Sequence, residues 1–366
     1  YSLYVQWNEN KDTALFDKLQ GDYINTGFAQ LALITRATLL ANEGNIDDSL
    51  RLLYLVKENS DGFFGNEFLN FISKINIARL ELSMKNFEKA LLMLESINTN
   101  EVNPTVKILI GDALFGSQRY DLAKKALNKF NMQNQIYGWY KIKRIGQIIE
   151  EEKNKDASLK YIEKQFNKID IPSTKIIFDM ATIYKNNKNY NQSIQLYNKV
   201  LSQINKDSDS FADTLYRRGG CYERMGDYKM SDIDLLNSLK INSDDPYVLN
   251  YLAYSWLERN YKIDEAMDML KKAYKQKKND PYIIDSIGWG YYLIGDYDKA
   301  ENYLIQAVQL MPDDPIVNDH YGDILWKLDR KLQAKYFWEN VLKLDSTEEE
   351  MKKNILEKLI KGPNKI

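Results

Sequence analysis

Histidine and cysteine are almost absent from this sequence, which holds one of each among 366 residues, His320 and Cys221. A disulfide within the chain requires two cysteines, so none can form. One histidine cannot build a multi-histidine metal site, and a general base also needs a paired nucleophile in a cleft. We therefore expect no catalytic residue, no metal site and no cofactor. His320 is then a hydrogen-bonded helix residue, and Cys221 a small buried apolar one.

Long apolar runs and a strong net charge are absent too. No stretch of eighteen or more apolar residues occurs, which excludes a transmembrane helix within these residues. The formal net charge is −2, so no global field attracts nucleic acid or an anionic membrane. The chain starts at Tyr1 rather than Met, and we expect a processed or trimmed product, with room for a signal peptide or membrane anchor upstream.

Glycine-rich phosphate loops are missing as well. Neither a Walker-type loop nor a dinucleotide fingerprint occurs, and Gly219–Gly220 falls within a helical pattern rather than after a strand. The carboxylate pairs Asp244–Asp245 and Asp313–Asp314 lack the ligand spacing of a calcium loop. Each pair precedes a proline, as Asp280 does, so these aspartates suit the starts of helices. The sequence therefore predicts a protein that is not an enzyme.

What the sequence does contain is a repeat. The run DSIGWGYYLIGDYDKAENYL, residues 285–304, returns as DHYGDILWKLDRKLQAKYFW, residues 319–338, in the same register 34 residues later. Gly288 then aligns with Gly322, and Ala300 with Ala334. A fixed period of this length predicts a solenoid of stacked helix–turn–helix units.

The register extends through most of the chain, with units starting near residues 30, 71, 104, 139, 174, 212, 246, 281 and 315. Small residues recur at the eighth and twentieth positions of each unit. Two helices cross there, and only a small side chain lets their backbones approach. We predict an all-α fold, a right-handed superhelical α-solenoid of about nine repeats. The small-residue pairs are Ala37/Ser49, Ala78/Ala90, Gly111/Ala123, Gly146/Ser158, Ala181/Ser193, Gly219/Ser231, Ala253/Ala266, Gly288/Ala300 and Gly322/Ala334.

The regularity of the repeats changes along the chain. Residues 1–29 are predicted to be a helical segment, residues 30–201 degenerate repeats, and residues 212–345 well-defined repeats, with a polar spacer at 202–211. Residues 346–362 are predicted to form one more helix, with Ser346 or Thr347 as its N-cap and Gly362 at its end. Such a helix caps the last repeat, which would otherwise expose its stacking face.

The period and its residues resemble the tetratricopeptide repeat. In that family each repeat has two helices, and the first helix lines the concave face of the superhelix, which is what the resemblance implies here. The repeat that starts at Pro281 carries the resemblance most fully, with Ile284, Ile287, Gly288, Tyr291, Ala300, Leu304, Ala307 and Pro312.

Two parts of the chain resemble narrower groups. Residues 21–130 resemble the periplasmic repeat domain of the ancillary SecYEG translocon subunit family. Residues 212–344 resemble alphaproteobacterial tetratricopeptide proteins and, more distantly, the outer-membrane lipoprotein that activates a carboxyl-terminal processing protease. The second likeness rests on Asp285–Ser286, Trp289, Asn318–His320 and Trp326. These resemblances imply a place in the bacterial periplasm or envelope, with the cytoplasm as the alternative, and a protease or translocase component as partner.

The concave face is the predicted binding surface. Aromatic side chains with polar tips alternate there with carboxylates, which suits an extended peptide segment that is basic or neutral. The Lys and Asn pair with which related repeats clamp a terminal carboxylate is absent. The alternative is that several of these aromatic rings pack between adjacent repeats. The predicted partner-binding residues are Tyr216, Tyr247, Asn250, Tyr254, Tyr282, Asp285, Trp289, Tyr292, Asp319, Asp323 and Trp326.

Two classes of function remain at this point. The first is a non-enzymatic scaffold or adaptor that presents this groove to a protein partner, either to activate a protease or as a translocon-associated chaperone. The second is a self-assembling structural repeat protein whose exposed aromatic residues bind other copies.

Overall fold

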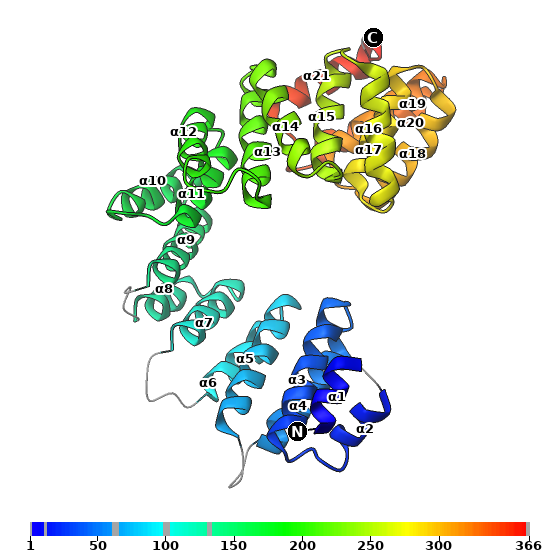
Figure 1. Cartoon of the computed structure of the whole chain (residues 1–366). Helices are drawn as coiled ribbons and strands as arrows, with labels where there is room; N and C mark the ends of the chain where they lie inside the picture. Colours follow the sequence, from blue (N-terminus) through cyan, green and yellow to red (C-terminus); the bar gives the residue numbers. More distant parts are fainter. Residues whose placement is uncertain (1, 11–12, 61–65, 98–102, 130–133, 364–366) are drawn as a thin grey trace. The chain divides into compact units, whose positions relative to one another are not determined.

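A computed structural model describes residues 2–10, 13–60, 66–97, 103–129 and 134–363. Within these ranges the chain forms α-helices joined by turns and contains no strand (Figure 1). The predicted all-α solenoid is confirmed. The described residues divide into two compact units, Tyr1–Ser173 and Thr174–Ile366. The residue ranges predicted from repeat regularity stay a prediction.

The first unit consists of helix pairs. Two helices, α1 and α2, precede the first predicted repeat, and Trp7 of α1 is buried against Phe16 of α2 with ring centroids 5.4 Å apart. The pairs are α1 (Ser2–Asn10) and α2 (Thr13–Gln20), α3 (Gly27–Asn42) and α4 (Ile46–Ser60), α5 (Glu67–Ser83) and α6 (Phe87–Glu95), α7 (Pro104–Gly116) and α8 (Tyr120–Asn128), and α9 (Gln135–Glu152) and α10 (Lys155–Phe166).

The second unit continues the same pattern and ends in a single helix. Each helix pair corresponds to one predicted repeat. The pairs are α11 (Thr174–Asn186) and α12 (Tyr190–Leu201), α13 (Asp209–Arg224) and α14 (Tyr228–Ile241), α15 (Pro246–Glu258) and α16 (Ile263–Gln276), α17 (Pro281–Leu293) and α18 (Tyr297–Leu310), and α19 (Pro315–Lys327) and α20 (Lys331–Lys343), followed by α21 (Glu349–Lys361).

The small residue at the eighth position lies against a large one at the twenty-fourth. A Cβ built on Gly288 would lie 2.8 Å from Leu304 Cγ, and one on Gly146 would lie 2.6 Å from Ile162 Cδ1. In the last repeat the indole of Trp338 occupies the space beside Gly322. The two helices of a repeat are therefore close enough that these positions exclude a side chain, as the register predicts.

Serine replaces alanine at the twentieth position without leaving its hydroxyl unpaired in two repeats. Ser49 Oγ donates to the carbonyl of Ala37 at 2.6 Å, and Ser193 Oγ donates to the carbonyl of Ala181 at 2.8 Å. In both cases the acceptor is the eighth residue of the same repeat. The hydroxyl thus ties the two helices at their crossing, which offsets the cost of burying it.

Aspartate and proline begin three successive first helices, as predicted. Asp280 Oδ1 accepts from the amides of Tyr282 at 3.1 Å and Ile283 at 3.3 Å, and Pro281 occupies the first helical position. Asp245 and Asp314 make the same pair of bonds at α15 and α19. The carboxylate satisfies amides that have no partner inside the helix.

The C-terminal helix α21 packs on α20 and buries Ile355 completely. The predicted N-cap, Ser346 or Thr347, is wrong: Glu348 holds that position, and Thr347 Oγ1 instead donates to the carbonyl of Val341 at 2.6 Å. Thr347 is used to fold the turn back onto α20 and cannot cap α21 as well. Gly362 ends the helix with φ of 80°, a left-handed conformation that glycine adopts without strain.

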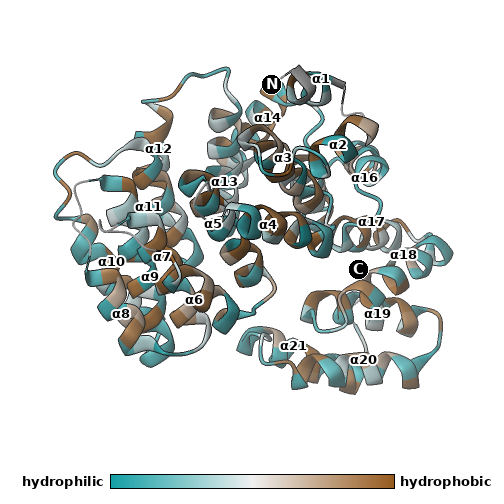
Figure 2. Ribbon diagram, turned by 90° about the horizontal axis from the view of Figure 1, so that it is seen from below, coloured by the Kyte–Doolittle hydropathy of each residue, from teal (hydrophilic) through white to brown (hydrophobic). Residues whose placement is uncertain are grey.

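Apolar and polar residues are mixed around single helices, α3 and α4 among them (Figure 2). Within the part of the chain that the structure describes, none of the helices combines the length and the apolarity that a membrane span requires.

Candidate functional site

The first helices of the last three repeats meet in an aromatic stack. The ring of Trp289 on α17 stacks on Tyr292 at a centroid distance of 4.6 Å and on His320 of α19 at 4.1 Å. Its Nε1 donates to Glu258 Oε1 of α15 at 2.6 Å. Trp289 is 9% exposed and Tyr292 2% exposed. Both rings are therefore packing elements between repeats in this structure.

His320 is buried and paired. Its Nδ1 lies 2.9 Å and 3.0 Å from the two carboxylate oxygens of Asp285 on α17, so it is the hydrogen-bonded helix residue that the sequence predicts. Burial opposes the charged ring, but the carboxylate of Asp285, with those of Asp319 and Asp323 farther away, raises the pKa of His320 above its ordinary value. Asp285 therefore holds its charge within the protein rather than presenting it to a partner.

The carboxylates of Asp319 and Asp323 receive a lysine from the C-terminal helix. Lys358 Nζ of α21 lies 2.6 Å from Asp319 Oδ1 and 2.8 Å from Asp323 Oδ1. Burial and the neighbouring Asp319 raise the pKa of Asp323 to about 6, against the opposing effect of Lys358. The acidic end of the predicted groove is thus occupied by the chain's own ammonium group.

The remaining predicted residues differ in exposure. Tyr216 packs edge to face on Tyr251 with ring centroids 5.8 Å apart, and burial raises the pKa of Tyr254 well above its ordinary value. Trp326 is partly buried, and its ring lies against Gly362 and 5.4 Å from that of Trp338. Asn250 is partly buried as well.

Tyr247 and Tyr282 are the two predicted residues that stay largely open, at 48% and 61% exposure. Each is the second residue of its repeat, directly after the proline that begins α15 or α17. Ile316, the equivalent residue of α19, is 50% exposed. The open part of the concave face therefore lies at the N-terminal ends of these helices.

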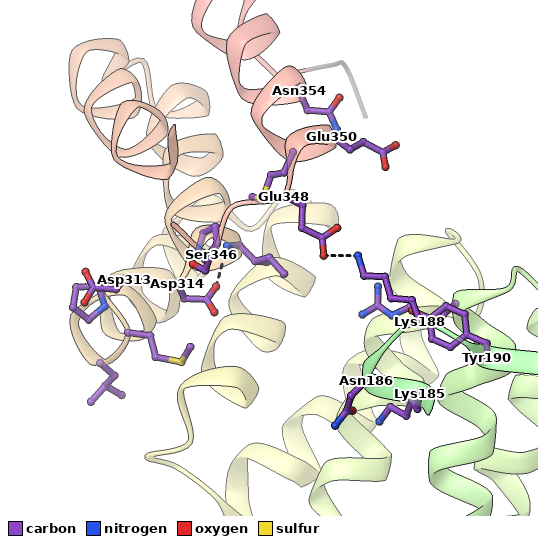
Figure 3. Close-up of a pocket in the computed structure, with 17 residues that line it drawn as sticks. Lys185, Asn186, Lys188, Tyr190, Asp313, Asp314, Ser346, Glu348, Glu350 and Asn354 are labelled. Atoms are coloured by element: carbon purple, nitrogen blue, oxygen red, sulfur yellow. Dashed lines mark hydrogen bonds and ion pairs between the residues drawn. The ribbon is translucent and has the colours of Figure 1, made fainter. Parts of the chain in front are cut away.

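A cavity of about 970 Å³ lies beside Ile316, the last residue of this row (Figure 3). Ile316 belongs to its wall, together with the turn between α18 and α19 and the start of α21. The opposite wall comes from α11, the turn that follows it, and the end of α13, which bring Lys185, Lys188 and Arg224. The cavity thus joins the first and the last elements of the second unit.

The two walls carry opposite charge. Lys185, Lys188 and Arg224 face a wall that holds the carboxylates of Asp313, Asp314, Glu348 and Glu350. Lys188 Nζ and Glu348 Oε1 meet at 2.8 Å, and Figure 3 shows this pair as a dashed line. Both side chains are about two-thirds exposed, at 66% and 68%.

The basic wall was missed in the sequence. Lys185 is the twelfth residue of the repeat that starts at 174, the position that the predicted binding residues Tyr292 and Trp326 hold in their repeats. Extending the same positions to this less regular repeat would have found it. Arg224, one place beyond the twelfth position of its repeat, and Lys188, in a turn, gave no such signal.

Cys221 lies in the core rather than at the cavity. Burial raises the pKa of the Cys221 thiol, which lies beside Ser193 in the core, so the expected buried role is confirmed. No group of three or more His, Cys, Asp or Glu residues within the described ranges is placed to hold a metal ion.

Family models of the tetratricopeptide repeat match four parts of the chain. Residues 4–135 match a tetratricopeptide repeat-like domain, and residues 174–207, 212–245 and 283–317 match tetratricopeptide repeats. A TPR repeat-containing protein of Pseudomonas aeruginosa is 32% identical over 143 residues, which are 39% of this chain and 23% of that protein. The chain thus spans less than a quarter of the length of this curated relative.

Solved structures of repeat proteins are similar at lower identity. A thermophilic TPR protein of Thermus thermophilus is 16% identical, with 51% of this chain and 100% of that chain covered and a TM-score of 0.44. MamA from Desulfovibrio magneticus RS-1 is 15% identical, with 48% and 97% covered and a TM-score of 0.39. Pseudomonas aeruginosa pilF is 18% identical, with 49% and 79% covered and a TM-score of 0.42.

The matched models cover repeats in both compact units, and the helix pairs follow the 34-residue register at its small-residue crossings. This chain is a tetratricopeptide-repeat protein with an α-solenoid fold.

Proposed function

We propose that this protein is a non-enzymatic scaffold that binds a partner protein through the concave side of its second unit. Tetratricopeptide repeats in general mediate contacts between proteins. The observation that carries the proposal is the cavity of about 970 Å³ together with the exposed row that leads to it, Tyr247, Tyr282 and Ile316. Apolar bodies exposed beside polar groups are the usual composition of a protein-binding surface.

The row and the cavity suit an extended segment. Tyr247, Tyr282 and Ile316 occupy the same repeat position on α15, α17 and α19, and these helices contact one another in that order. A bound segment that crosses the three helices would meet one exposed side chain per repeat before it reaches the cavity. The cavity is at the upper end of the range of about 300–1,000 Å³ typical of ligand pockets, so it holds a few residues of such a segment.

The partner we favour is a component of the bacterial envelope, with a protease that the scaffold activates ahead of a translocase component. Support comes from the resemblance of residues 212–344 to a protease-activating lipoprotein and of residues 21–130 to a translocon subunit. The proposal places the protein in the periplasm or at the envelope, and fractionation of cells that produce the full chain tests this placement.

Site-specific crosslinking tests the binding surface. A photo-crosslinking residue replaces Tyr282 in the full chain, and the matched control carries it at Tyr336, which is 65% exposed on the second helix α20. We expect a discrete adduct from position 282 and none from position 336, with the partner identified by mass spectrometry. Adducts from position 336 alone, or from neither position, would contradict the proposed surface.

A self-assembling protein is the second candidate, and one observation favours it. Leu356 and Ile360 of α21 are 52% and 86% exposed, one helical turn apart on the same face. A second copy could cover this apolar strip. Light scattering of the full chain across a hundredfold range of concentration, beside the variant Ile360→Glu, tests it. A mass that stays monomeric throughout rules the candidate out.

A further inference from the structure

The cavity of the second unit contains a half-buried positive charge. Lys185 lies on its α11 wall and has no ion pair or hydrogen bond from its ammonium group within the described residues. Two carboxylates of α13 are engaged by arginines of the same helix. Asp213 Oδ2 lies 3.0 Å from Arg217 Nε, and Glu223 Oε2 lies 3.5 Å from Arg224 Nε. The ammonium group of Lys185 therefore has no carboxylate in contact with it among the described residues.

The electrostatics of Lys185 agree with this geometry. Burial lowers the pKa of Lys185, and the cations of Arg217 and Arg224 lower it further, while Asp213 opposes them. A lysine with a carboxylate partner in contact shows the reverse, as Lys358 does, whose pKa is raised by Asp319 and Asp323 in spite of burial. At Lys185, burial and the neighbouring cations thus outweigh the neighbouring carboxylate.

Most acidic residues of the concave face and of the cavity already have partners within the chain. Asp285 is paired with His320, and Asp319 and Asp323 with Lys358. On the opposite wall of the cavity, Glu348 pairs with Lys188, and Asp314 accepts the first two amides available in α19. Asp313 and Glu350 are exposed to solvent there, so water compensates their charge.

We propose that the cavity binds an acidic segment of a partner protein, with a carboxylate of that segment between Lys185 and Arg224. The inference rests on the proposed function and specifies the charge of the partner segment, which is acidic rather than basic or neutral as the sequence predicts. Apolar residues that flank the acidic one would contact Leu310, Met311 and Ile316, which line the same cavity.

The pair Lys188–Glu348 gives the segment a second point of attachment. Both side chains are exposed, and exposed ion pairs contribute little because water and salt screen them. A carboxylate of the bound segment can replace Glu348 as the partner of Lys188 at little cost. Binding of an acidic segment should therefore weaken with added salt, as expected for contacts between opposite charges.

Three blocked decapeptides in which leucine alternates with glutamate, lysine or glutamine serve as probes, with the full chain as receptor. Fluorescence anisotropy measures their affinities. We expect the glutamate peptide to bind at least tenfold more tightly than the other two. The variant Lys185→Glu should lose at least tenfold in affinity for it, while Lys199→Glu, at an exposed position on α12 outside the cavity, should lose less than twofold.

Chemical protection locates the contact within the chain. Limited acetylation, followed by mass spectrometry, reports the reaction rate of each lysine, and the glutamate peptide should slow acetylation of Lys185 at least threefold without changing that of Lys199. Because Lys185 makes no ion pair, Lys185→Gln should keep the helical circular dichroism of the parent while losing the glutamate peptide.

The outcomes separate this inference from the proposed function. Equal binding of the three peptides, preference for the lysine peptide, or unprotected Lys185 would overturn the acidic partner, even if crosslinking from position 282 still captures a protein. Loss of that crosslink under conditions in which Lys185 is still protected would instead contradict the proposed surface and leave the charge preference standing.

Discussion

Single aromatic residues on the first helices differ in how far their neighbours cover them. Trp289 and Tyr292 are 9% and 2% exposed, whereas Tyr282 and Tyr247 are 61% and 48% exposed. The sequence predicts all four for partner binding, with packing between repeats as the alternative. The covered pair comes from the middle and end of α17, where α15 and α19 both approach, and the exposed pair follows the prolines at the helix starts.

Trp289→Ala should therefore destabilise the protein. Truncation removes the stacks on Tyr292 and His320 and the hydrogen bond to Glu258, and large-to-small changes of a buried tryptophan cost about 3–5 kcal/mol. Tyr282→Ala is the matched control and should change the free energy of unfolding by about 0.5 kcal/mol or less. Urea denaturation of both variants measures this. Equal free energies of unfolding for the Trp289 variant and the parent would show that the indole does not pack between the repeats.

The buried charges of α17 and α19 predict that stability falls as pH rises. The pKa of His320 is raised in the folded state, so its contribution is complete below the unfolded value of about 6.5 and is lost as pH rises through the folded one. The pKa of Asp323, raised to about 6, acts in the same direction, because ionising a buried carboxyl costs more in the folded state. We expect a larger free energy of unfolding at pH 6 than at pH 8.

Replacing the histidine isolates its part of this dependence. In His320→Gln the difference between pH 6 and pH 8 should shrink, and the part that remains should come from Asp323 and disappear in the double variant with Asp323→Asn. Denaturation curves of the three proteins at both pH values provide the comparison. A pH dependence identical in parent and His320→Gln would show that the imidazole does not gain a proton on folding.

Pairs of helices are held by the crossing at the eighth position. The side chain that faces this position comes from sixteen residues later, as Leu304 does for Gly288, and the contact recurs at Gly111, Gly146, Gly219 and Gly322. The same sequence also contains a glycine with room around it: a Cβ on Gly220 would lie 3.5 Å from the hydroxyl of Tyr251, an ordinary contact distance.

Gly288→Ala and Gly220→Ala should therefore have opposite effects. The added methyl group at position 288 overlaps Leu304 and Tyr303, and overpacking of this kind costs about 1–3 kcal/mol. At position 220 alanine fits and gains up to about 1 kcal/mol of helix propensity. Thermal and urea unfolding of the two variants measure both signs. Stabilisation by Gly288→Ala would mean that α17 and α18 are farther apart than the structure places them.

The C-terminal helix α21 makes contacts that the repeat pattern does not predict. The sequence predicts α21 as a cap for the exposed face of the last repeat, and Ile355 fills that role. The same helix also carries Lys358 to Asp319 and Asp323, an interaction that the repeat pattern does not contain. A single helix thus closes the solenoid and supplies the lysine that its last two aspartates share.

At the scale of the whole molecule, each compact unit has its own hydrophobic core. In the second unit, Ala181, Tyr197 and Cys221 pack together, so α12 is buried against α13 within one body. The sequence instead separates regular from degenerate repeats around residues 202–211. Cutting there would expose the face of α13 that α12 covers.

Two fragments with different first residues test where the independently folding second unit begins. The fragment 174–366 should fold with one cooperative transition, because its helix pairs keep their neighbours. The fragment 212–366 should unfold at lower temperature, since it lacks α11 and α12 and exposes Cys221. Circular dichroism with heating measures both midpoints. A higher midpoint for the shorter fragment would place the boundary at the polar spacer.

The sequence by itself determined the period, the helix pairs and their starts, because these depend on contacts over short distances along the chain. Gly288 needs only Leu304 sixteen residues later, and Asp280 only the next two amides. Tertiary structure alone decided which of the predicted binding residues remain exposed and which are paired within the chain. Asp285 meets His320 35 residues away, Asp319 meets Lys358 39 residues away, and Lys188 meets Glu348 160 residues away. Those partners come together through the stacking and winding of the repeats, and small rotations that accumulate from one repeat to the next leave no pattern in the residues of any single one.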